Sequence, residues 1–281
     1  MRVAISGASG FIGRHLTAAL RARGDDIVAI SLRDPARAAA ACEGSSAIVN
    51  LAGAPVSKRW TPEQKREIER SRVELPRAFI GALEGLDAKP GQYVSASAVG
   101  YYGTSETATF TEASPSGSNF LARVCVGWET EALRAREFGL RVAIVRTGLV
   151  LGADGGALAK LLPIFRLGFG GVVASGKQWY SWIHIDDQVG VYLRAIDGFD
   201  GVLNATAPNP IQNKDFTAAL GAAVHRPTFL PTPGFAISLI LGEGASVVTE
   251  GQRVIPEATL ASGYSFRYPA IGPALEAIVS S

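Results

Sequence analysis

Residues 1–23 read MRVAISGASGFIGRHLTAALRAR, in which a glycine-rich turn, GASGFIG at residues 7–13, separates a short apolar run from a helical pattern. The run Arg2–Ser6 is typical of a buried strand, and apolar residues recur at helical spacing over 11–23. A turn in this context points backbone N–H groups and the positive end of the helix dipole at a pyrophosphate. It favours a dinucleotide site over a structural turn without ligand. The predicted contacts are Gly7, Ser9, Gly10, Phe11, Ile12 and Gly13.

Strand and helix patterns alternate through the first half of the chain, which predicts an α/β fold with a parallel, doubly wound sheet of Rossmann type. Only residues 34–47 separate the second strand pattern from the third, and one crossover takes about a dozen residues. We therefore expect the usual edge strand three to be missing or vestigial. Pro76 is expected to kink the first long helix. The strand patterns lie at 27–32, 47–51, 92–95 and 141–146, and the long helices at 62–83 and 119–137.

The composition and pattern of the sequence change after Gly148, where Gly and Pro become frequent and short helical patterns alternate with loops. The sequence thus predicts a dinucleotide-binding domain, residues 1–148, to which 189–204 return. A smaller C-terminal lobe on the substrate side would comprise 149–188 and 205–281.

Composition excludes several classes of protein. The 281 residues are 47% hydrophobic and 19% charged, which supplies a large core and argues against disorder. A net charge of +2 without a basic run predicts no nucleic-acid partner. Two cysteines make neither a disulfide framework nor a zinc site, so no metal is expected. The sequence shows no leader pattern and no apolar run long enough to span a bilayer, so we expect a cytoplasmic protein without a membrane partner.

The end of the second strand pattern carries a cation, Arg33, where NAD-binding folds usually place an acid that holds the ribose 2′-hydroxyl. A cation at this position suits a 2′-phosphate, so NADP(H) is expected as the cofactor in preference to NAD. The alternative is a surface arginine that pairs with Asp34.

Strings recognisable from a known family run from one end of the chain to the other. The chain resembles the extended and atypical short-chain dehydrogenase/reductases, and more narrowly the epimerase family proteins with a C-terminal DUF1731 segment, often described as nucleoside-diphosphate-sugar epimerases. The matching strings include Ser6–Gly13, Asn50–Gly53, Arg59-Trp60, Ser71-Arg72, Ser95–Gly103, Trp128-Glu129, Arg146–Gly148, Trp182–His184, Asn204–Pro208 and Gly251–Val254.

The resemblance implies roles for particular positions. The turn after the third strand pattern would lie against the adenosine, and the 95–97 strand end beside the nicotinamide. Ser97 matches the serine that assists carbonyl chemistry, whereas Leu121 and Cys125 stand where the superfamily has its Tyr and Lys. Arg72 matches the usual helix asparagine. The further cofactor contacts implied are Leu51, Ala52, Gly53, Arg72, Ser95, Ala96, Arg146 and Gly148.

Other residues could replace the missing pair. Hydride chemistry on a carbonyl needs a proton donor and polarising groups. Tyr101 or Tyr102 could be that donor if Arg72 supplied a nearby positive charge; otherwise both tyrosines simply pack the loop. Cys125 would need a lowered pKa to act, and buried cysteines are mostly inert.

The substrate cleft is expected to involve His184, Trp182 and Arg59. His184 precedes two aspartates but is expected to cap a helix and line the cleft rather than catalyse. Trp182 could stack on a ring or cover the core, and Arg59 could bind an anionic substrate or remain a surface charge. The resemblance implies a homodimer through the two long helices.

Two hypotheses for function remain open at this stage. One is an NADP(H)-dependent oxidoreductase or epimerase-like enzyme that acts on a small molecule without the usual Tyr/Lys pair. The other is a non-catalytic regulatory protein that senses NADPH.

Overall fold

A six-stranded, fully parallel sheet lies at the centre of the computed structural model, which describes residues 1–231 and 234–280. The strand order is β10-β6-β4-β3-β1-β2, so β2 is an edge strand and the described chain has no strand beyond it. The prediction that edge strand three is missing is therefore confirmed. The strands are β1 (Arg2–Ser6), β2 (Asp26–Ile30), β3 (Ala47–Asn50), β4 (Gln92–Ala98), β6 (Arg141–Thr147) and β10 (Gly201–Ala205).

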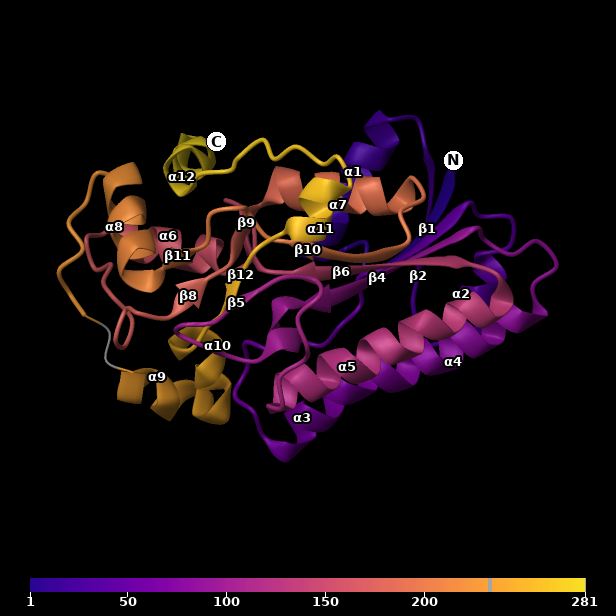
Figure 1. Cartoon of the computed structure of the whole chain (residues 1–281), viewed down its shortest axis with the longest axis horizontal. Coiled ribbons are helices and arrows are strands. Elements are labelled where there is room, and N and C mark those ends of the chain that lie inside the picture. Colours follow the sequence, from indigo (N-terminus) through magenta and orange to yellow (C-terminus); the bar gives the residue numbers. More distant parts are fainter. Residues whose placement is uncertain (232–233, 281) are drawn as a thin grey trace.

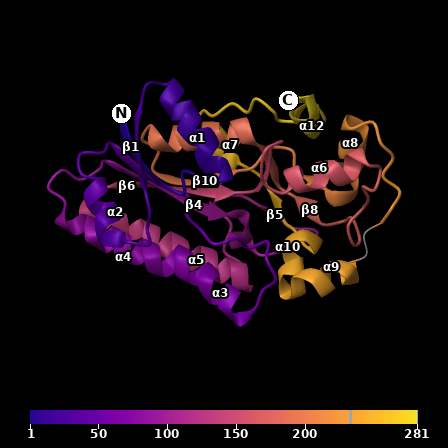
Figure 2. The same cartoon turned by 180° about the vertical axis from the view of Figure 1, so that it is seen from behind.

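Helices cover both faces of this sheet, as the two views in Figures 1 and 2 show. Side chains on β1 alternate between two buried cores: Ile5 packs with Leu16 on one face, and Ala4 packs with Phe79 on the other. This alternation follows from the pleat of a strand that is buried on both sides. The first face carries α1 (Phe11–Ala22) and α7 (Ile185–Ile196), and the second carries α2 (Pro35–Ala41), α4 (Leu75–Ala82) and α5 (Phe120–Leu133).

The first long helix is not continuous. It consists of α3 (Pro62–Glu69), a π-helical turn (Arg70–Glu74) and α4, with Pro76 in the first turn of α4. In a regular α-helix the ring of Pro76 would clash with the carbonyl of Arg72. The wider π turn, centred on Arg72, accommodates the proline, and the kink itself stays a prediction.

The second long helix begins and ends as its sequence predicts. The Asn119 side chain accepts a hydrogen bond from the backbone N–H of Ala122, which caps α5. The helix continues as a 3₁₀ segment (Arg134–Phe138) and ends at Gly139, whose φ of 85° is left-handed.

The C-terminal part adds a third buried core beyond the carboxyl ends of the strands, around Leu158, Phe216 and Leu275. β10 and α7 return to the central sheet, while the domain boundaries remain a prediction. No helix among the described residues has the length and hydropathy to cross a membrane. The remaining elements are β5 (Thr109–Phe110), β7 (Leu149–Leu151), α6 (Leu158–Arg166), β8 (Trp179–Tyr180), β9 (Trp182–His184), β11 (Ile211–Gln212), α8 (Asn213–Ala223), α9 (Gly234–Leu241), α10 (Ser246–Thr249), β12 (Arg253–Val254), α11 (Glu257–Ala261) and α12 (Ile271–Ser280), with short 3₁₀ turns at Leu83–Gly85, Val99–Tyr102 and Gly242–Ala245.

Candidate functional site

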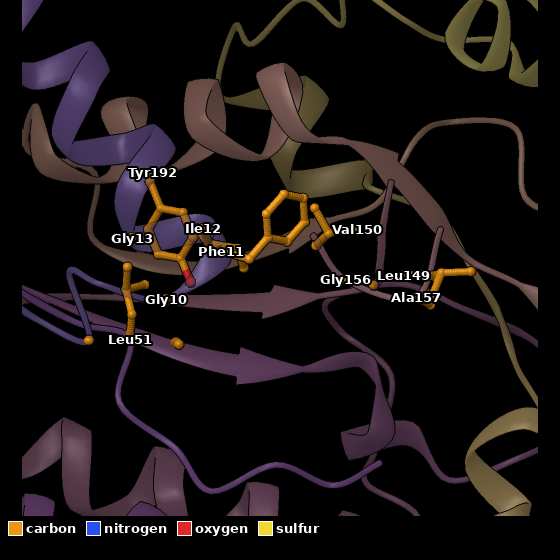
Figure 3. Close-up of a pocket in the computed structure, with 13 residues that line it drawn as sticks. Gly10, Phe11, Ile12, Gly13, Leu51, Leu149, Val150, Gly156, Ala157 and Tyr192 are labelled. Atoms are coloured by element: carbon orange, nitrogen blue, oxygen red, sulfur yellow. The ribbon is translucent and has the colours of Figure 1, made fainter. Parts of the chain in front are cut away.

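A cavity of about 330 Å³ opens at the carboxyl ends of the central strands (Figure 3). Open α/β sheets bind ligands at this edge because the loops and helix N-termini converge there. Its walls come from the turn after β1, the residues after β3, the end of β4 and the segment after β6. The lining residues are Gly7, Gly10, Phe11, Ile12, Gly13, Leu51, Ala96, Gly148, Leu149, Val150, Gly156, Ala157 and Tyr192.

The glycine turn lines the cavity, and the spacing of its glycines has a steric cause. Gly7 has φ +73°, and its carbonyl accepts a hydrogen bond of 3.0 Å from the N–H of Gly10. A Cβ on Gly13 would lie 2.2 Å from that same carbonyl oxygen, and a Cβ on Gly7 would lie 3.0 Å from the backbone of Leu51. The turn therefore leaves no room for side chains where α1 approaches the sheet.

The N-terminus of α1 faces this cavity. Gly10 is the N-cap residue and offers no side-chain cap, so the first-turn N–H groups and the helix dipole are left for a ligand. Backbone donors in a side-chain-free cradle fit the pyrophosphate of a dinucleotide. The residues present thus match the cofactor that the sequence predicts.

A glycine-rich loop, residues 152–157, packs over the start of α1. A Cβ on Gly155 would lie 2.3 Å from the Phe11 ring, and one on Gly152 would lie 2.7 Å from it. Asp154 in this loop contacts both Arg14 and His15 of α1, at 3.2 Å and 3.0 Å. Sequence reasoning missed this wall of the cavity, although its three closely spaced glycines were visible.

A buried ion pair lies behind the end of β4. Glu129 on α5 accepts the Ser97 hydroxyl hydrogen bond at 2.6 Å and forms a two-point pair with Arg146 at 2.8 Å. The side chains of Arg146 and Glu129 are only 4% and 8% exposed. The structure thus gives Arg146 a carboxylate partner, and Ser97 donates to the same carboxylate; the cofactor contact of Arg146 stays a prediction. Sequence reasoning missed Glu129 because it resembles any helix glutamate.

Arg146, not Arg72, is the cation beside the two tyrosines. Its guanidinium lies 3.4 Å from the centre of the Tyr101 ring and donates to the Tyr102 hydroxyl at 2.9 Å. Burial raises the pKa of Tyr102 to about 12, although Arg146 acts in the opposite direction. The Tyr102 hydroxyl also donates to Asn204 at 2.7 Å, so this tyrosine belongs to the buried network and Tyr101 is the half-buried one of the two.

Arg72 lies elsewhere, between the residues after β3 and helix α5. Its guanidinium lies 5.2 Å from the centre of the Trp128 ring and packs against Gly53. Burial raises the pKa of the nearby Cys125 thiol to about 11, with Glu129 raising it further and Arg72 acting in the opposite direction. The hypothesis of a thiol activated by a lowered pKa is therefore wrong.

The predicted cleft residues are not brought together at the cavity. Trp182 is fully buried in the third core, and its indole N–H donates to the carbonyl of Asn209 at 3.0 Å, so it covers the core and cannot stack on a ligand. His184 Nδ1 accepts the backbone N–H of Asp186 and caps α7, as expected. Burial lowers the pKa of His184, although Asp186 and Asp187 act in the opposite direction. Arg59 donates to the carbonyl of Leu239.

The remaining predicted cofactor residues lie at three strand ends. Arg33 is exposed just after β2, at the edge of the sheet. Asp34 caps α2 by accepting the N–H of Arg37, which gives it a role other than pairing with Arg33. Ala52 donates its N–H to the Asn50 side chain, and the Ser95 hydroxyl donates to a backbone carbonyl.

The fold and the cavity together define a Rossmann-type α/β protein whose dinucleotide site lies at the carboxyl ends of the central strands. The family model described as "NAD dependent epimerase/dehydratase family" matches residues 3–206, and a "Domain of unknown function (DUF1731)" matches 232–278. The chain belongs to the NAD-dependent epimerase/dehydratase family, which confirms the resemblance seen in the sequence.

Named relatives match over the whole chain. An Arabidopsis thaliana protein, "Epimerase family protein SDR39U1 homolog, chloroplastic", is 43% identical over 99% of this chain and 87% of its own length. The Bacillus subtilis "Epimerase family protein YfhF" is 33% identical over 100% of this chain and 98% of its own. A crystal structure of "human epimerase family protein SDR39U1 (isoform2) with NADPH" has a TM-score of 0.91 at 35% identity, covering 100% of this chain and 99% of that one.

Proposed function

We propose that this protein binds NADP(H) and uses it as an oxidoreductase or epimerase-like enzyme on a small molecule. The observation that carries the proposal is the side-chain-free cradle of Gly7, Gly10 and Gly13 below the N-terminus of α1. The similarity to a protein crystallised with NADPH supports the choice of cofactor. Arg33 at the end of β2 would take the 2′-phosphate.

The reacting end of the site would lie at β4 and β6. When bound, NADPH supplies a hydride. Ala96 and Gly148 line the cavity there, with Ser97 next along β4. Tyr101 is our candidate proton donor, because it is half-buried and the centre of its ring lies 3.4 Å from the Arg146 guanidinium. By the family motif, Leu121 and Cys125 stand in place of the Tyr and Lys, and the cation beside the two tyrosines is Arg146.

The proposal is tested first by cofactor titration and then by turnover. NADPH should bind more tightly than NADH, and equal affinities would reject the role of Arg33. Oxidation of NADPH against a panel of aldehydes, ketones and sugar nucleotides should reveal turnover. Ser97→Ala and Arg72→Ala should then abolish it and leave cofactor binding largely intact. Unchanged turnover in both variants would reject the site.

A second candidate function is an NADPH sensor without catalysis. The engagement of Ser97 and Tyr102 in the buried Glu129–Arg146 network favours it, since both hydroxyls already have protein partners. Tight NADPH binding without turnover of any substrate in the panel would favour the sensor.

We also propose that the protein is a homodimer through α3–α4 and α5. Val126 and Leu133 are large apolar residues of α5, 38% and 39% exposed, and lie seven residues apart on one face of the helix. Two such faces would bury each other in a four-helix interface. The substrate would then bind on the C-terminal lobe of 149–188 and 205–281, away from this interface.

A further inference from the structure

Arg72 is a largely buried cation without a compensating anion. Among residues 1–231 and 234–280 it forms no ion pair, whereas the other buried arginine beside the site, Arg146, has the carboxylate of Glu129. Burial lowers the pKa of Arg72 and no acidic side chain opposes that effect; only the Cys125 thiol does. A buried charge without a partner is costly, so its retention needs an explanation.

The neighbouring residues hold the Arg72 guanidinium in place but leave most of its N–H donors without a hydrogen-bond acceptor in the part of the chain that the structure describes. It stacks on Trp128, and a Cβ on Gly53 would lie 2.9 Å from one of its nitrogens. Its Nη1 contacts the carbonyl of Ile68 and the Ser71 hydroxyl, and both distances are long, at 3.5 Å. A guanidinium has five N–H donors, so several remain for a ligand.

The location of Arg72 separates it from the phosphates of the cofactor. Gly53 lies two residues beyond Leu51, which lines the cavity at the end of β3. The Cys125 thiol lies close enough to Arg72 for the arginine to oppose the rise in its pKa that burial causes. The same thiol interacts with Ser97 and Ala98 at the end of β4. The pyrophosphate cradle is at the end of β1 and the proposed 2′-phosphate residue at the end of β2, on the other side of β3. Arg72 therefore lies on the β3–β4 side of the site, away from the pyrophosphate cradle and from Arg33.

We propose that Arg72 is the binding residue for an oxyanion, a carboxylate or a phosphate, carried by the substrate. This inference rests on the proposed function and adds the class of substrate: an anionic one. Bidentate hydrogen bonds from a guanidinium match both groups, and stacking on Trp128 orients the fork. The π turn at Arg70–Glu74 presents the arginine side chain between Gly53 and Trp128.

The test uses the whole chain saturated with NADPH. The indole N–H resonance of Trp128 is followed by nuclear magnetic resonance and assigned with Trp128→Phe, while sodium acetate or inorganic phosphate is added at constant ionic strength. Acetamide is the neutral counterpart of acetate. We expect saturable shifts with acetate, phosphate or both, and none with acetamide.

Two arginines of the same helical segment provide the matched comparison. Arg72→Met should weaken anion binding about tenfold or more, as expected for loss of hydrogen bonds to a charged group. Arg77→Met should leave it unchanged, because Arg77 already pairs with Glu131 at 2.6 Å. Arg72→Met should also melt no lower than the unsubstituted protein, since it removes an uncompensated buried charge.

Three results would overturn the inference: no anion binding to the NADPH complex, equal binding in Arg72→Met, or an equally large loss of NADPH affinity in that variant. The last result would assign Arg72 to the cofactor. Failure of the unsubstituted protein to bind NADPH at all is a different outcome, because it refutes the proposed function itself.

Discussion

Substituting Gly13 by alanine tests the cofactor cradle most directly. The added Cβ would lie 2.2 Å from the Gly7 carbonyl oxygen and 2.8 Å from the Ala8 Cα, both of which are backbone atoms that cannot rotate away. The turn must therefore shift, and overpacking of this kind costs about 1–3 kcal/mol of stability. The shift also misaligns N–H groups that would bind the pyrophosphate. Losing one or two charge-assisted hydrogen bonds lowers NADPH affinity about 100-fold.

The effect can be read from thermal unfolding with and without NADPH. At a concentration of about 100 times its Kd, NADPH stabilises the unsubstituted protein by about 2.7 kcal/mol. At that same concentration a 100-fold weaker variant gains only about 0.4 kcal/mol. With a change in Tm of about 2–4 °C per kcal/mol for a chain of this size class, the ligand-induced shift falls from about 5–11 °C to about 1–2 °C.

Gly81→Ala is the matched control. A Cβ on Gly81, in α4, meets no atom within 4 Å, so this alanine should be neutral or stabilising and leave the NADPH-induced shift intact. If Gly13→Ala retained the full shift, the cradle would not be the binding site, and the steric reasoning that underlies the proposed function would be wrong.

Four further predictions concern other parts of the molecule. Arg33→Ala should weaken NADPH about tenfold or more in fluorescence titration and leave NADH unchanged; a parallel loss for both cofactors would contradict the 2′-phosphate role. Glu129→Ala should lower the free energy of unfolding by about 3–5 kcal/mol in urea, because it leaves Arg146 buried and unpaired; a loss below 1 kcal/mol would argue against a buried pair. Alkylation of Cys125 in the folded protein at pH 8 should be about two orders of magnitude slower than that of a free thiol and should rise until about pH 11, because burial raises its pKa; a plateau near pH 8 would mean an activated thiol. Val126→Asp should convert a dimer to monomers in analytical ultracentrifugation, and an unchanged mass would place the interface elsewhere.

The features that could be predicted from the sequence depend on local geometry or on connection length. The glycines at 7, 10 and 13 are fixed by contacts within one turn, and a turn is short enough to be recognised from its spacing. The missing edge strand followed from the shortness of the connection between β2 and β3, in which residues 34–46 hold α2 and no strand. The range 119–137 predicted for the second long helix agrees with α5 and the 3₁₀ segment that follows it, and the Asn119 side chain caps its start.

The features that could not be predicted depend on contacts between distant segments. Ser97 and Arg146 were recognised from their strings, but their contacts with Glu129 form only when β4, α5 and β6 are packed together. Trp182 lies in a recognisable string, but whether its ring faces a cleft or a core depends on the third core, which is assembled from α6, α8 and α12. The π turn depends on the competition between a proline and the helix that contains it.

The two arginines of the site differ in whether a carboxylate balances their charge. The sequence placed Arg72 beside the tyrosines, but Arg146 fills that role and its charge is balanced by Glu129. Removing Glu129 therefore has a structural cost. Removing the charge of Arg72, which has no ion-pair partner among the described residues, should cost binding instead. The loss of stability can thus be measured at the Arg146 pair and the loss of binding at Arg72, because only Arg72 has no carboxylate partner among the described residues and can bind an anion.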